Sequence, residues 1–155
     1  VAWGLRVLAS LAPPEELLGT VHSLLQKLGR EYTRDPEKKL VLLSWLREHP
    51  DLASLQPASG PTRDEAVLPL LEDFVDDVRI GAARALTVGP PSDAAREALI
   101  ALLLRDRDNA RVRGDVLQAL HDLGADVKGH RADVEVLLVE PWFLDREGRV
   151  KRRGA

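Results

Sequence analysis

One segment of the chain repeats itself after 34 residues, and this repeat is the strongest constraint on the fold. Setting Val78 against Val112 aligns an arginine with an arginine and apolar residues with apolar residues, without a gap. The other aligned pairs are Arg79 with Arg113, Ala82 with Val116, Ala83 with Leu117, Ala85 with Ala119 and Leu86 with Leu120. The apolar spacing in both copies is that of one helical face. A helical unit that recurs at this period predicts repeats that stack to bury a shared core.

A weaker third copy lies further toward the N-terminus, at an offset of 40 residues. It places Leu42, Leu43, Trp45 and Leu46 on Ala82, Ala83, Ala85 and Leu86. Lys38 falls where the second copy has Val78, which weakens the match. In the physical interpretation of the motif, the valines enter the core, the small alanines allow close helix approach, and the final leucines close the core. Arg79 and Arg113 are expected to pair with Asp77, Asp106 and Asp108 and so to keep neighbouring repeats in register.

Glycine and proline divide most of the remaining chain into segments of helical length. Pro14 followed by acidic residues, Asp35-Pro36, Thr62 or Asp64, and Ser92-Asp93 are start signals, whereas Gly29 is a C-cap candidate. Pro69 predicts a kink or a shift in the helix start. We expect one long irregular connection at 51–62 and a turn at 145–148 between two short strands. The helices predicted from these signals cover 3–12, 14–28, 37–48, 62–74, 77–88, 94–105, part of 108–123, and 132–139.

Composition excludes several classes of protein. The 155 residues include no cysteine, so disulfides, thiolate metal sites and cysteine nucleophiles are ruled out. Hydrophobic residues make up 45% and charged residues 30%, and no apolar run reaches the length of a membrane span. Aromatic residues are only 4%, which is unfavourable for a β-sandwich or barrel core. The fold class predicted is all-α: a right-handed α-solenoid of about three to four antiparallel helix pairs, with a possible short C-terminal hairpin.

The chain is predicted to form a single repeat domain over 1–155. Residues 1–12 form a partial first repeat or cap in this interpretation, because a solenoid end needs covering. The repeats are expected at 14–49, 62–88 and 92–124, and residues 130–155 form a C-terminal cap with a basic tail. Trp142 and Phe143 are expected to cover the last helix pair.

The stretches DDVRIGAARAL at 76–86 and RVRGDVLQALHDLG at 111–124 resemble HEAT repeats, especially the short bacterial type first associated with phycobilisome lyases. Pro69 in the preceding helix fits that pattern. The resemblance covers about 60 residues well and about 110 loosely. It implies a curved stack of helix pairs whose second helices line a concave face. The family includes scaffolds, transport adaptors, lyase subunits and DNA glycosylases of related architecture, so the resemblance does not select one activity.

No residues form a pattern typical of catalysis or metal binding. His22, His49, His121 and His130 lack the spacing of a metal pair and are interpreted as isolated surface histidines. His121 and Asp122 are neighbours in sequence and point in different directions on a helix, so they make a poor acid–base couple. The chain has no phosphate-binding glycine motif and no nucleophile elbow. The acidic cluster Glu72, Asp73, Asp76 and Asp77 lacks the period of a calcium loop. We therefore expect a non-enzyme without cofactor or metal.

Charge is unevenly distributed along a chain whose net charge is -3. Residues 61–110 carry -4, whereas Arg146, Arg149, Lys151, Arg152 and Arg153 with Glu147 carry +4 at the C-terminus. One terminal basic cluster is usually solvated, and we interpret it so, although nucleic acid or an acidic protein is the alternative. The acidic total gives no general attraction to nucleic acid, and neither a nucleic acid nor a membrane is the expected partner.

The predicted binding surface consists of polar positions on the second helices that fall outside the apolar pattern. Such a mixed polar row suits a protein or peptide better than a phosphate backbone. The sequence thus predicts a non-catalytic, cytoplasmic scaffold or adaptor that binds another protein. The alternatives are a lyase- or chaperone-like subunit that handles a prosthetic group, and a DNA-binding module. Ser44, Arg84 and Gln118 form one row of the surface, and Arg47, Thr87 and His121 form the next.

Overall fold

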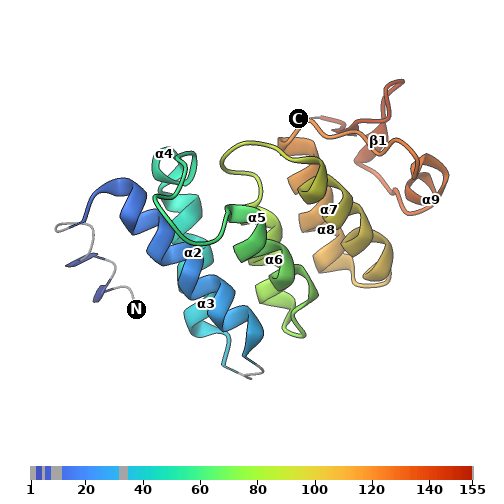
Figure 1. Cartoon of the computed structure of the whole chain (residues 1–155). Helices are drawn as coiled ribbons and strands as arrows, with labels where there is room; N and C mark the ends of the chain where they lie inside the picture. The colour runs from blue at the N-terminus through green and yellow to red at the C-terminus, as the bar shows by residue number, and fades with distance from the viewer. Residues whose placement is uncertain (1–2, 5, 8–11, 32–34, 155) are drawn as a thin grey trace. The chain divides into compact units, whose positions relative to one another are not determined.

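The computed structural model describes residues 3–4, 6–7, 12–31 and 35–154. The chain is mostly helical and divides into two compact units, Val1–Pro90 and Pro91–Ala155 (Figure 1). The boundary falls in the Gly89-Pro90-Pro91 segment, where the sequence predicts a break between repeats. Within the described ranges, no helix combines the length and the apolar character needed to cross a membrane. The single domain over 1–155 stays a prediction.

The first unit contains two helix pairs. Helix α2 (Pro14–Arg30) begins at the predicted proline and carries Glu15 and Glu16 in its first turn, where the helix dipole stabilises carboxylates. Helices α3 (Glu37–Glu48) and α4 (Pro50–Ala53) follow. Helix α5 (Arg63–Val67) starts in a capping box formed by Thr62 and Glu65, and it passes directly into the 3-10 helix η1 (Leu68–Glu72). Helix α6 (Asp76–Ala85) completes the second pair.

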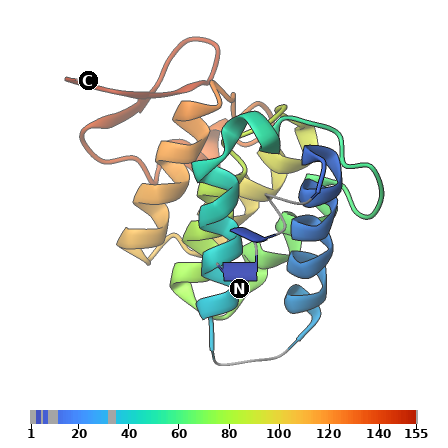
Figure 2. The same ribbon diagram turned by 90° about the vertical axis from the view of Figure 1, so that its left-hand side faces the viewer.

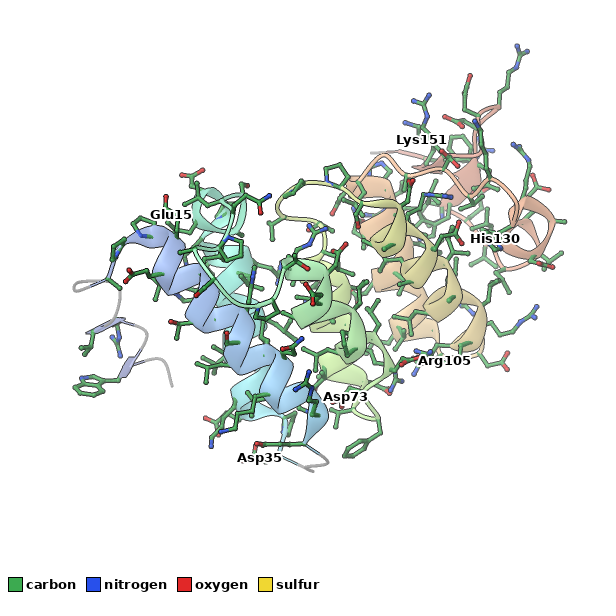
Figure 3. The ribbon with its side chains drawn as sticks, viewed as in Figure 1. Glu15, Asp35, Asp73, Arg105, His130 and Lys151 are labelled. Atoms are coloured by element: carbon green, nitrogen blue, oxygen red, sulfur yellow. The ribbon has the colours of Figure 1, made fainter. Side chains whose placement is uncertain are left out.

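These pairs pack first helix against first helix and second against second. Helix α2 contacts α5, and α3 contacts α6 (Figures 1 and 2). At the α3–α6 contact, a Cβ added to Gly81 would lie 3.2 Å from Cδ1 of Leu43. The missing side chain at Gly81 therefore lets the two backbones approach closely.

The second unit contains helices α7 (Asp93–Arg105) and α8 (Ala110–Asp122), which pack against each other. Ser92 and Asn109 cap them, each through a side-chain oxygen that accepts the backbone N–H three residues later. The short helix α9 (Arg131–Glu135) leads to strands β1 (Trp142–Leu144) and β2 (Val150–Arg152). The strands are antiparallel, with Phe143 opposite Lys151. The predicted C-terminal hairpin is therefore confirmed.

The core positions of the 34-residue repeat are buried in both copies. Each of the five aligned apolar residues of the first copy is fully covered, and its counterpart in the second copy is at most 2% exposed. Leu42, Leu43, Trp45 and Leu46 of the weaker copy are also buried. The alignment therefore identified the core correctly. The buried pairs are Val78 and Val112, Ala82 and Val116, Ala83 and Leu117, Ala85 and Ala119, and Leu86 and Leu120.

The two repeat arginines make the same contact within their own repeats. Arg79 donates from Nη1 to the backbone oxygen of Asp73 at 2.8 Å, and Arg113 donates from Nη1 to that of Arg107 at 2.7 Å. Both carbonyls lie six residues earlier, in the turn that joins the two helices of the pair. Their structural role thus includes fixing this turn, and their pairing with Asp77, Asp106 and Asp108 between repeats stays a prediction.

Several predicted helix boundaries were wrong. Gly29 lies inside α2 rather than capping it, and the connection predicted as irregular over 51–62 begins within α4. The helices predicted over 77–88 and 132–139 end earlier, at Ala85 and Glu135. Pro69 ends the α-helical hydrogen bonding at Val67 and converts the next turn to η1, because proline lacks an N–H donor. Of the helix predicted over 3–12, residues 3–4 and 6–7 are helical, Ala12 is not, and the others lie outside the described residues.

A buried ion pair joins the two helix pairs of the first unit. Lys39 of α3 donates from Nζ to Oδ2 of Asp73 at 2.6 Å, and both side chains are nearly inaccessible to solvent. The other carboxylate oxygen of Asp73 accepts the backbone N–H of Val75. These two contacts satisfy the carboxylate at the turn between η1 and α6.

We expect Lys39→Met to lower the free energy of unfolding by about 3 kcal/mol, because the change leaves the Asp73 carboxylate buried without its counter-ion. Lys38→Met is the matched control, since Lys38 is the exposed neighbour on the same helix. Urea denaturation of both variants measures the difference. If both variants lose the same small amount of unfolding free energy, the ion pair does not stabilise the unit.

Candidate interaction surface

In the first unit, the predicted surface residues are accessible to a partner. Ser44 and Arg47 on α3 and Arg84 on α6 are all exposed, whereas their apolar neighbours on these helices are buried. Thr87, which follows the end of α6, is half-buried and donates its hydroxyl to the backbone oxygen of Arg84 at 2.6 Å. The helices α3 and α6, which carry Ser44, Arg47 and Arg84, pack against each other.

In the second unit, the predicted residues lie against the C-terminal hairpin. Gln118 and His121 on α8 are half-buried. The amide of Gln118 donates to Asp122 at 2.8 Å, and its oxygen accepts a long hydrogen bond of 3.5 Å from Arg152. The ring of His121 meets that of Trp142 edge-on, with centroids 6.0 Å apart. This part of the predicted surface is therefore shared between α8 and the hairpin.

Three contacts fix the hairpin in place. Arg131 of α9 donates to the backbone oxygens of Asp145 and Arg146, at 3.0 and 3.3 Å. The backbone N–H of Val127 donates to the oxygen of Gly148 at 2.9 Å. At the turn, Gly148 has a φ of 80°, a conformation that favours glycine. The backbone N–H of Arg149 donates to the Asp145 carboxylate, and this bond lowers the pKa of Asp145 below its ordinary value.

The hairpin presents two different faces because side chains alternate along each strand. Trp142, paired with Arg152, shares the inner face with Val150, which is buried where β2 packs on α8. Phe143, paired with Lys151, lies on the outer face. A guanidinium covers the ring on each face: Arg152 Cζ lies 5.5 Å from the Trp142 centroid, and Arg153 Cζ lies 4.5 Å from the Phe143 centroid. The sequence prediction did not assign Trp142, Phe143 and the basic residues to the surface, although the alternation in WFLDREGRVKRR carries this signal.

The histidines of the chain differ in their surroundings. His49 is exposed and stacks on Trp45, and His130 contacts Glu97 at 2.9 Å. His121 and Asp122 are 3.5 Å apart, which is long for a hydrogen bond. The interpretation of His22 as a surface histidine was wrong, because its side chain is buried on α2 beneath the segment that precedes Thr62.

His22 has one hydrogen-bonded nitrogen and one without a partner. Its Nδ1 lies 3.0 Å from the backbone oxygen of Pro61 and therefore carries the proton that this carbonyl accepts, while Nε2 is buried and unpaired. Burial lowers the pKa of His22, the carbonyl of Pro61 opposes this effect, and the nearby Arg63 adds to it. Burial thus disfavours the protonated form of His22 inside the first unit.

Two pockets contain polar groups. In the first unit, a pocket of about 330 Å³ is lined by Arg30, Phe74 and the Lys39–Asp73 ion pair, whose charges already satisfy each other. In the second, a pocket of about 430 Å³ lies near Ser92 and Arg96, and Arg96 contacts Asp126. Over the part of the chain that the structure describes, no group of three histidine or acidic side chains could hold a metal ion.

Comparison of the chain with protein-family models, with curated proteins and with solved structures gave no match. The surface therefore has to be interpreted from its own residues.

We expect the stability of the protein to fall more steeply below pH 6.5 than that of a His22→Gln variant. The pKa of His22 is lowered in the folded state, so the unfolded chain binds the proton more readily, and stability is lost as the pH falls from the unfolded pKa toward the folded one. Urea denaturation across this pH range measures the effect. His49→Gln is the matched control, because it makes the same exchange at an exposed position, and an unchanged pH dependence in His22→Gln would contradict the assignment.

Proposed function

We propose that the protein is a non-catalytic scaffold of HEAT-like helix pairs that binds another protein through its second helices. The arrangement would form a right-handed solenoid, and the surface would consist of polar positions on the second helices. Ser44, Arg47 and Arg84 contribute to this surface in the first unit, and Gln118 and His121 contribute in the second.

The observation that carries this proposal is that α3 and α6 have both buried apolar and exposed polar residues. Their apolar residues are buried by packing between the helix pairs, yet Ser44, Arg47 and Arg84 on the same helices are exposed. A helix whose core positions are fixed by its neighbours holds its outer side chains on a rigid frame, which lowers the entropy lost when a partner binds. Mixed polar side chains on such a frame suit the polar rim and hydrogen bonds of a protein interface.

The repeat supports the same conclusion. Both copies bury equivalent residues and use equivalent arginines to fix the turn before the second helix. Repeated units of this kind keep their framework while the outward side chains vary, as scaffolds that bind proteins require.

The test is affinity capture from the native lysate with the wild-type chain and with the double variant Arg47→Glu, Arg84→Glu. We expect a partner protein that the wild type retains to be retained about tenfold less by the variant, because two cations of the surface become acidic. Mass spectrometry quantifies the bound proteins, and circular dichroism verifies that helicity is unchanged.

The matched control is the double variant Lys27→Glu, Arg30→Glu on α2, which makes the same change of charge at exposed positions of a first helix. A partner that is lost equally from both variants responds to net charge alone. A partner confirmed by direct binding that is retained fully by the α3–α6 variant would refute the role of this surface.

A further inference from the structure

We infer that the outer face of the C-terminal hairpin is a docking site for an acidic segment of a partner protein. This face consists of Phe143 and the basic residues Arg149, Lys151 and Arg153, which the strand alternation and the pairing of Phe143 with Lys151 place on one side. The inference rests on the proposed function and names the chemistry of the partner at one end of the scaffold.

One cation of this face, Arg153, is held in a defined position. Arg153 lies over the Phe143 ring, and the backbone N–H of Arg153 donates to the oxygen of Pro141 at 2.8 Å, which extends the hairpin pairing by one residue. The hairpin beneath is anchored by Arg131 and by the buried Val150. A cation that is already ordered by an aromatic ring loses less side-chain entropy on binding a carboxylate than a free one does.

The acidic groups nearby leave a surplus of positive charge. Glu140 lies 3.4 Å from Arg153, but both side chains are mostly exposed, and exposed pairs of this kind contribute little free energy. Asp145 accepts the backbone N–H of Arg149 at the turn and stays ionised. Residues 140–153, which include both of these acids, nevertheless carry +2, and the side chains of Arg149 and Arg153 are accessible to a partner.

The geometry favours a peptide carboxylate over a nucleic acid. Proteins that bind single-stranded nucleic acid stack the bases on open aromatic faces. Here Arg153 lies over Phe143, and both Arg152 and the ring of His121 contact Trp142. Strand β2 has three residues and so spans only about 10 Å, which is short for tracking a phosphate backbone. Acidic and basic residues are equal in number over 91–155, so no wider basic field extends the site.

The test measures binding of a fluorescent peptide of alternating Glu and Gly residues to the full chain by anisotropy at low salt. We expect the double variant Lys151→Gln, Arg153→Gln to bind at least about tenfold more weakly than the wild type. The matched control is the double variant Arg107→Gln, Lys128→Gln, because it removes two exposed cations of the same unit outside the hairpin. Its affinity for the peptide should stay within about twofold of that of the wild type.

A second variant tests the ordering of the cation separately from its charge. Phe143→Leu keeps every charge and removes the ring under Arg153, so we expect weaker binding than in the wild type and stronger binding than in the double variant. Thermal unfolding of each variant verifies that the hairpin change has not unfolded the chain.

Three results would overturn the inference. The first is no binding of the Glu-Gly peptide by the wild type, and the second is an equal loss of binding in the hairpin and control variants. The third is tighter binding of an oligothymidylate with the same number of charges, which would assign the face to a phosphate backbone. The capture experiment on Arg47 and Arg84 is independent, so a partner that depends on those residues would preserve the proposed function even if the hairpin binds no acidic peptide.

Discussion

Close packing of the second helices is the constraint on which the first unit depends. Helix α6 can approach α3 because Gly81 has no side chain where it meets Leu40 and Leu43 of α3, and the neighbouring Ala82, Ala83 and Ala85 are small and buried. Burial of these small residues contributes little apolar area each, so stability comes from the dispersion contacts that close approach allows and from the leucines around them. A larger residue at Gly81 would meet Leu43 and separate α6 from α3.

The buried polar groups of the first unit stand between its packed elements. Lys39 reaches from α3 to Asp73 beside η1, and Arg63 of α5 donates to the backbone oxygen of Val88 at 2.7 Å, beyond the end of α6. His22 of α2 binds the oxygen of Pro61 in the connecting segment. Each contact ties a helix to a carbonyl or carboxylate of an irregular segment. These contacts therefore define the positions of the irregular segments, as the apolar core defines those of the helices.

Sequence reasoning succeeded where one local rule determines the outcome. Helical periodicity identified the buried residues of both repeats, and Pro14, Thr62 and Ser92 marked helix starts because capping depends on neighbouring residues alone. It failed where the outcome depends on contacts distant in sequence. His22 has the pattern of a surface residue on α2 until the segment near Pro61 covers it, 39 residues later. Gly29 carries the signal of a cap, but α2 continues one residue beyond it.

The same distinction applies to the surface. Exposure of Ser44, Arg47 and Arg84 follows from the helical pattern, because positions outside an apolar stripe point to solvent. The surroundings of Gln118 and His121 do not follow from it, since the hairpin that covers them is 34 residues away at Arg152. From composition alone, a basic C-terminal cluster is expected to be solvated. Here the hairpin separates its cations into two faces, one turned toward α8 and one toward solvent, and strand pairing provides that order.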